Sequence, residues 1–248
     1  MVLESLESTL FLAVAILAAL AAVMGIVVLE GFFRNKLKDL FNDVNYFIFF
    51  FIVAGYFLYA LGEVSFFLTR KVFKNAGQIG IQDVYWTGGA FLIFVSFIAL
   101  SLLLHREKGR AGKFFLQALV GTAIVILVSS LILGFSQKSQ DYSFVTFYPI
   151  ISALIVAASF SIILYFKELG PMAQPLAIFW MASCLILIGD ILFSFGTAKS
   201  ILTITDLLSD AFYLLGYGVS GIGFLALRVK MNRLAFENSN SKRTPRKV

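Results

Sequence analysis

Hydrophobic residues are gathered into seven segments of 20–23 residues, separated by short stretches that carry most of the charged residues. A helix rises 1.5 Å per residue, so about 20 apolar residues suffice to cross a hydrocarbon core of about 30 Å. The pattern therefore predicts an all-α integral membrane protein, a bundle of seven transmembrane helices. The segments cover residues 9–29, 46–68, 84–104, 114–135, 144–166, 176–195 and 206–227.

The composition supports a membrane protein over a soluble one. Of the 248 residues, 60% are hydrophobic and 14% are charged, whereas soluble domains average about 45–50% and about 25%. The spans and their connections use nearly the whole chain. We therefore expect one transmembrane domain, residues 1–230, followed by a basic, disordered tail, residues 231–248, in a multi-pass protein of the cell membrane.

Basic residues are distributed unequally between the two sides of the predicted bundle. The loops after the first, third and fifth segments and the tail together hold fifteen of the twenty lysines and arginines. Cytoplasmic loops carry such an excess, so we predict an N-terminus outside and a C-terminus in the cytoplasm. The loop at 70–83, with Arg70, Lys71 and Lys74, is an external exception. The basic cytoplasmic face is expected to bind anionic lipid headgroups, and its short loops do not indicate a nucleic-acid surface.

The residues that usually hold metals and haem are scarce. The chain has one cysteine, Cys184, and one histidine, His105. An intrachain disulfide is therefore impossible, and neither haem nor zinc held by paired histidines is expected. We interpret Cys184 as a small buried apolar residue and His105 as a loop residue at the cytoplasmic edge, and we predict no cofactor.

The last apolar segment carries a polar stripe. Asp206, Asp210, Tyr213 and Tyr217 fall at offsets 0, 4, 7 and 11, so they share one face of a helix. Such a stripe is costly against lipid and should face protein or a watery cavity. Asp206 also fits the N-cap position, where aspartate is favoured.

Two further acids are predicted at the same depth. Glu63 lies five residues before the outer end of the second segment, and it shares a helix face with Tyr56 and Tyr59. Asp190 lies five residues before the end of the sixth segment, which runs in the same direction. Together with Asp210, these acids should converge in the outer third of the membrane. We expect an outward-facing polar pocket suited to a cation, an ammonium-bearing ligand or protons.

A structural interpretation of the acids stays open beside the functional one. Arg70, Lys71 or Lys199 could neutralise them, or they could join helices by hydrogen bonds. Trp86 is interpreted as an interface anchor, and the glycines at 216, 218, 221 and 223 as sites of close helix packing.

Two membrane-protein families share part of the pattern. The seven spans and external N-terminus resemble those of microbial rhodopsins, which attach retinal to a lysine in the last helix. No lysine occurs in the last segment before Lys230, so retinal is not expected. Aspartates in the last two segments are similar to those of intramembrane aspartyl proteases, but the residues before Asp190 read LIG, with Leu187 where the family's GxGD motif begins with glycine.

Three functions fit these patterns. The first is a sensor or receptor-like protein that binds a cation or small cationic ligand and signals to a cytoplasmic or membrane partner, because the acids lie outside and the basic tail inside. The second is a cation- or proton-coupled transporter or channel, because intramembrane carboxylates commonly mark ion pathways. The third is a non-catalytic membrane scaffold. No nucleophile–base pair or metal-ligand spacing is visible, so an enzyme is not expected.

Overall fold

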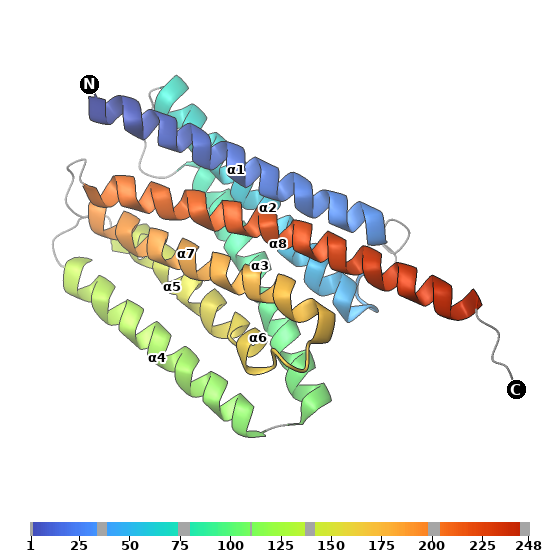
Figure 1. Ribbon diagram of the computed structural model, residues 1–248. Helices are drawn as coiled ribbons and strands as arrows, with labels where there is room; N and C mark the ends of the chain where they lie inside the picture. The colour runs from blue at the N-terminus through green and yellow to red at the C-terminus, as the bar shows by residue number, and fades with distance from the viewer. Residues whose placement is uncertain are drawn as a thin grey trace, which may run out of the picture.

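The computed structural model describes residues 2–33, 39–73, 80–109, 111–136, 142–197 and 204–243, and in these ranges the chain is helical and contains no strand. The main helices are arranged as an elongated bundle (Figure 1). They are α1 (Val2–Phe33), α2 (Val44–Phe67), α3 (Ile81–Lys108), α4 (Ala111–Ser136), α5 (Tyr142–Ser159), α6 (Ser161–Leu164), α7 (Ala173–Thr197) and α8 (Ile204–Arg243). A π-helical turn, η2 (Leu68–Val72), extends α2, and a 3-10 turn, η3 (Gly170–Met172), precedes α7.

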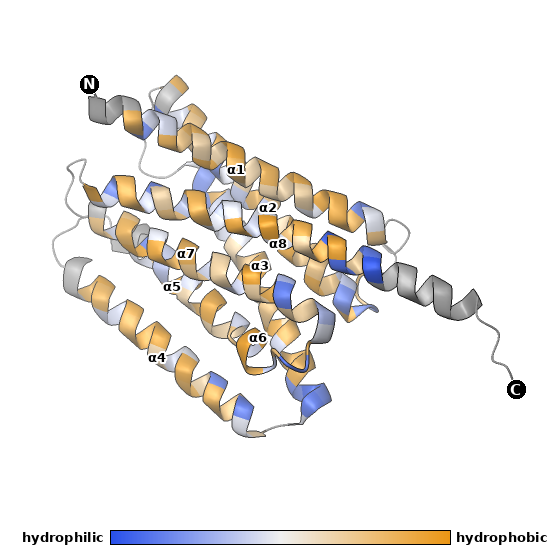
Figure 2. Ribbon diagram, in the orientation of Figure 1, coloured by the Kyte–Doolittle hydropathy of each residue, from blue (hydrophilic) through white to orange (hydrophobic). Residues whose placement is uncertain are grey.

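Seven helical stretches of 19–30 residues are long and apolar enough to cross a membrane. Among the described residues, the number of such helices equals the predicted number of spans, which suggests a multi-pass membrane protein. Figure 2 shows apolar residues along the length of each stretch and hydrophilic residues concentrated near the helix ends. The helices extend beyond most of the predicted apolar segments because polar end residues continue the same turns.

Local chemistry explains where several helices begin and end. The Asp43 side chain accepts hydrogen bonds from the backbone N–H groups of Asn45 and Tyr46 and caps the start of α2. Asp83 accepts from the backbone N–H of Gly80 at 2.8 Å and closes the first turn of α3. Gly109 ends α3 with a φ of 59°, a left-handed conformation that favours glycine.

Glycines allow the closest helix contacts. Gly55 of α2 and Gly89 of α3 face each other so closely that a Cβ on Gly89 would lie 2.7 Å from the Gly55 carbonyl oxygen. On α8, Gly216 and Gly223 approach α7, while Gly218 and Gly221 approach α1. The predicted close packing is confirmed for Gly216 and Gly223, where a Cβ would lie 2.8 Å and 3.1 Å from α7 side chains, whereas at Gly218 and Gly221 a Cβ would make only ordinary contacts at 3.7 Å and 3.9 Å. Helix α8 lies between α1 and α7, and α4 lies at the opposite edge, mainly against α5 (Figure 1).

The fifth span is interrupted, which the sequence did not predict. Helix α5 ends at Ser159 and α6 begins at Ser161. Both serine side chains donate to backbone carbonyls three or four residues earlier, a bonding mode that competes with regular helix structure.

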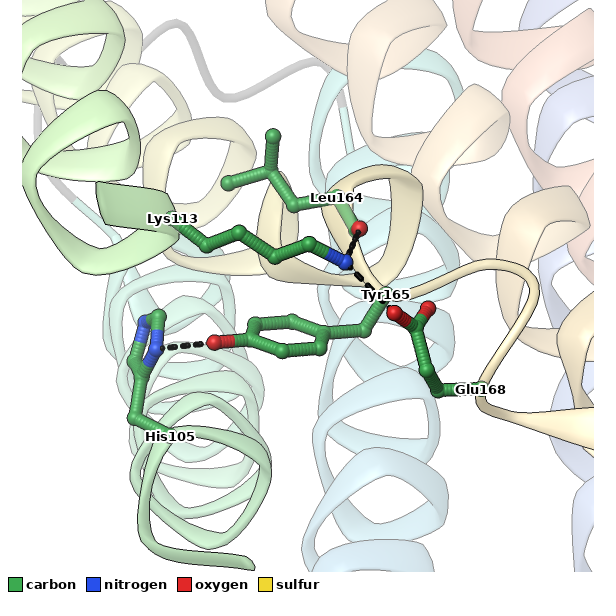
Figure 3. Close-up of polar contacts among 5 residues, drawn as sticks. All are labelled: His105, Lys113, Leu164, Tyr165 and Glu168. Carbon is green, nitrogen blue, oxygen red and sulfur yellow. Dashed lines mark hydrogen bonds and ion pairs between the residues drawn. The ribbon is translucent and has the colours of Figure 1, made fainter. Parts of the chain in front are cut away.

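A polar network fixes the chain after this interruption (Figure 3). Lys113 of α4 donates to the Leu164 carbonyl at 2.5 Å and pairs with Glu168 at 2.8 Å. Tyr165 is fully buried, and its hydroxyl lies 2.8 Å from Nδ1 of His105. The prediction that His105 is a loop residue is therefore wrong. His105 belongs to the last turn of α3, because the helix continues past the apolar segment. The two nitrogens of its imidazole ring form hydrogen bonds with side chains of two neighbouring elements.

Helix α8 is longer than its apolar segment. It continues to Arg243, so residues 231–243, which the sequence assigned to a disordered tail, are helical. Residues 244–248 lie outside the described residues.

Candidate functional site

A cavity of about 330 Å³ lies at the end of the bundle where α1 and α8 begin. Helices α1, α2, α3, α5, α7 and α8 contribute to its lining, as does Arg70 of η2, whereas none of the described side chains of α4 does. Its volume is within the range of roughly 300–1,000 Å³ that is usual for small-molecule sites. Seven of the eight residues singled out from the sequence line it: Tyr59, Glu63, Asp190, Asp206, Asp210, Tyr213 and Tyr217.

Two buried carboxyl groups are held by tyrosine hydroxyls of α8. Tyr217 donates to Oε1 of Glu63 at 2.8 Å, and Tyr213 donates to Oδ1 of Asp190 at 2.7 Å. Ser152 of α5 donates to the second oxygen of Asp190. Glu63 is 9% exposed and Asp190 is 8% exposed. Because a carboxyl group is costly to bury without donors, these hydroxyls are what allows both acids to sit inside the bundle.

The other acids lie closer to the open end. Asp210 is 7% exposed, whereas Asp206 and Glu7 are only half-buried. The expectation that Asp206 is an N-cap is wrong, because α8 already begins at Ile204 and Asp206 lies within its first turn. Asp206 lines the cavity from that position, and its backbone carbonyl accepts a hydrogen bond from Ser209.

Tyr148, Ser152 and Trp86 line the cavity but were not among the predicted site residues. Tyr148 and Ser152 come from α5, where a spacing of four places them on one face. Tyr148 donates to Asp83 at 2.6 Å. Trp86 of α3, interpreted from the sequence as an interface anchor, lines the cavity as well. The spacing of Tyr148 and Ser152 could have predicted that both face the site, but the fifth apolar segment contains no acidic residue.

Two glycines allow aromatic side chains of the cavity lining to pack closely against neighbouring helices. A Cβ on Gly62 would lie 2.4 Å from the Trp86 ring, and one on Gly189 would lie 2.8 Å from the Tyr213 ring. The glycine next to each acid in the sequence therefore lets an aromatic ring approach that acid. The indole nitrogen of Trp86 is buried and has no hydrogen-bond acceptor among the described residues.

The eighth predicted residue, Tyr56, lies below the cavity and not in it. It borders a void of about 10 Å³, which Tyr59 and Ser152 also line. Its hydroxyl lies 2.7 Å from Ser220 Oγ. The Tyr56 ring contacts Phe224 at a centroid distance of 5.5 Å, and Phe224 contacts Phe179 at 4.7 Å. Both phenylalanines are fully buried, so aromatic packing closes the floor.

The cavity lining contains five carboxyl side chains and one basic side chain, Arg70, among the described residues. The Arg70 guanidinium lies 5.2 Å from the centre of the Phe66 ring, a distance typical of cation–π contacts. Two other proposed neutralising residues give no information, because Lys199 and the side chain of Lys71 lie outside the described residues.

The acids are not grouped as a metal centre. In the described part of the chain, no cluster of three or more His, Cys, Asp or Glu residues is arranged to hold a metal ion. Instead the carboxyl groups are distributed along the depth of the cavity.

No protein-family model matches this chain, and comparisons with curated proteins and with solved structures found no match.

Proposed function

We propose that this protein is a receptor-like membrane sensor that binds a small cationic ligand from outside and transmits binding to its cytoplasmic end. The observation that carries the proposal is the convergence of carboxyl groups from four helices, α1, α2, α7 and α8, on one cavity whose floor is closed. The orientation follows from the distribution of lysine and arginine, which assigns the cavity to the external side.

The lining is suited to an organic cation. Carboxyl groups outnumber basic groups by five to one among the described lining residues. Aromatic rings of Tyr59, Phe66, Trp86 and Tyr213 surround them. Aromatic faces attract ammonium groups by about 0.5–2 kcal/mol each, with the larger value in desolvated sites. A ligand with both a positive charge and an apolar surface would contact both the carboxyl groups and the aromatic rings.

Helix α8 is the element that can couple the cavity to the other side. Its 40 residues form one helix of about 60 Å. Tyr213 and Tyr217 near its start bind Asp190 and Glu63, while Arg228 and Arg233 lie toward the opposite end. A ligand that competes for either carboxyl group would change the α8 contacts, and it can shift a conformational equilibrium only by its difference in affinity for the two helix arrangements.

The chain offers an optical readout for binding. It has two tryptophans, Trp86 in the cavity lining and Trp180 outside it. In a Trp180→Phe background, titration with tetramethylammonium should change the fluorescence of Trp86. Asp190→Asn should weaken the apparent affinity at least about tenfold, as expected for a lost charged contact. The control Asp39→Asn, an exposed acid outside the cavity, should bind like the parent. Equal affinity in both variants would refute the assignment.

Signalling requires a second measurement. Hydrogen exchange in lipid nanodiscs should show that saturating tetramethylammonium protects peptides from the start of α8 and also changes peptides beyond Arg228. A change limited to the cavity end would support binding but contradict transmission through α8.

Transport is the second candidate, and the small void beneath the cavity favours it. Tyr56, Ser152 and Ser183 place hydroxyl groups around this void, and Ser183 lies on the inner side of Asp190 along α7. A pathway would have to open the aromatic floor at Phe179 and Phe224. Cation or proton flux in proteoliposomes, abolished by Glu63→Gln, would favour transport over sensing.

A further inference from the structure

The carboxyl groups of the cavity occupy different depths. Along α8, Asp206 and Tyr217 both line the cavity and are eleven residues apart, which corresponds to about 16 Å of helix. Along α2 and η2, Tyr59 and Arg70 line it over the same number of residues. Two separate stretches therefore show that the cavity is elongated along the helix axes.

Hydrogen bonds assign each acid to a level. Glu63 is bound by Tyr217 and lies deepest, and Asp190 is bound by Tyr213 one turn higher. Asp210 is one further turn toward the entrance, and Asp206 lies four residues beyond it. Glu63, Asp190 and Asp210 are all buried, and Asp206 is half-buried.

The cavity has a volume of about 330 Å³. The rings of Phe11, Phe66 and Trp86 form part of its lining. These rings contact one another, with centroid distances of 5.2 Å for Phe11–Phe66 and 5.3 Å for Phe66–Trp86.

We propose that the ligand is a linear polyamine-like cation, with one ammonium group at Glu63 and Asp190 and a second near Asp210 and Asp206, joined by an alkyl chain that passes the aromatic rings. This inference rests on the proposed cation binding and specifies its ligand class. A single ammonium group could reach the carboxyl groups of one level only.

Arg70 distinguishes this ligand from a zwitterion. It lines the cavity, as do the half-buried acids Glu7 and Asp206. An outer ammonium group is repelled by Arg70, whereas an outer carboxylate would be attracted to it. Neutralising Arg70 therefore has opposite effects on the two ligand types.

The test uses α,ω-diaminoalkanes of four to ten carbons, with 1-aminoalkanes and ω-aminoalkanoates of equal length as matched probes. Affinities are measured by Trp86 fluorescence for the full chain with Trp180→Phe, in a maltoside detergent. The readout is the ratio of diamine to monoamine affinity at each length. This ratio cancels the gain from alkyl burial and the fraction of protein that is folded.

We expect the ratio to reach at least about tenfold at the length that spans both levels, as for one added charged contact. The double variant Asp206→Asn, Asp210→Asn should reduce it to about one, while Glu63→Gln should weaken diamines and monoamines alike. Arg70→Gln should strengthen diamine binding. The inner-end control Glu107→Gln should change nothing.

Two results would overturn the inference while leaving cation binding intact. One is a ratio near one at every length, and the other is tightest binding by the aminoalkanoates with a loss in Arg70→Gln. If none of the amines binds and tetramethylammonium also fails, the proposed function itself is refuted.

Discussion

Replacing Gly89 by alanine should destabilise the bundle, because α2 and α3 are in backbone contact there. The added Cβ would lie 2.7 Å from the Gly55 carbonyl oxygen and 2.9 Å from a ring carbon of Tyr59. Ordinary contact begins at 3.4 Å, so the helices would have to separate by about 0.7 Å. The carbonyl belongs to a regular helix and cannot turn away as a flexible side chain would.

The magnitude follows from two opposing terms. Overpacking of a well-packed interior costs about 1–3 kcal/mol. Alanine recovers about 0.5–1 kcal/mol of helix propensity relative to glycine. Taking the middle of each range, we expect Gly89→Ala to lower the free energy of unfolding by about 1 kcal/mol. For a chain of this size, that corresponds to a fall in Tm of about 2–4 °C.

The matched control is Gly31→Ala in α1, where a Cβ would meet no atom within 4 Å. It should be neutral or stabilising by up to about 1 kcal/mol. Both variants are measured in maltoside by far-UV circular dichroism during thermal unfolding and by titration with a denaturing detergent. The reasoning is refuted if Gly89→Ala is as stable as the unmodified protein, or if Gly31→Ala loses as much stability as Gly89→Ala.

Two further substitutions test the polar contacts at the opposite ends of the bundle. Tyr217→Phe removes the donor to Glu63 and should cost about 1–3 kcal/mol, because a buried acceptor loses its partner; unchanged thermal stability would contradict that role. Lys113→Met removes the partly buried pair with Glu168 and should cost about 1–2 kcal/mol, whereas exposed Lys108→Met should stay within about 0.5 kcal/mol. Equal effects of the two lysine changes would show that the pair contributes nothing specific.

Much of the candidate site was visible as helical spacing. The offsets that join Asp206, Asp210, Tyr213 and Tyr217 place them on one face of any helix, whatever surrounds it. The depths of Glu63 and Asp190 followed from the alternating direction of the spans. Spacing did not distinguish Tyr56 from Tyr59, which share a face but differ in depth. Tyr59 reaches the cavity, and Tyr56 packs into its floor.

The sequence by itself determined that seven long apolar helical stretches form in the described part of the chain and that the second and last of them carry a polar face, because helix periodicity and hydrophobic length are local properties of the chain. Tertiary structure alone decided that Tyr148, Ser152 and Trp86 join the acids, that α4 stays outside the cavity, and that the fifth span breaks after Ser159. These outcomes depend on which helices are neighbours and how closely they approach. That choice is made by contacts between distant segments, such as Gly55 with Gly89, which no local pattern encodes.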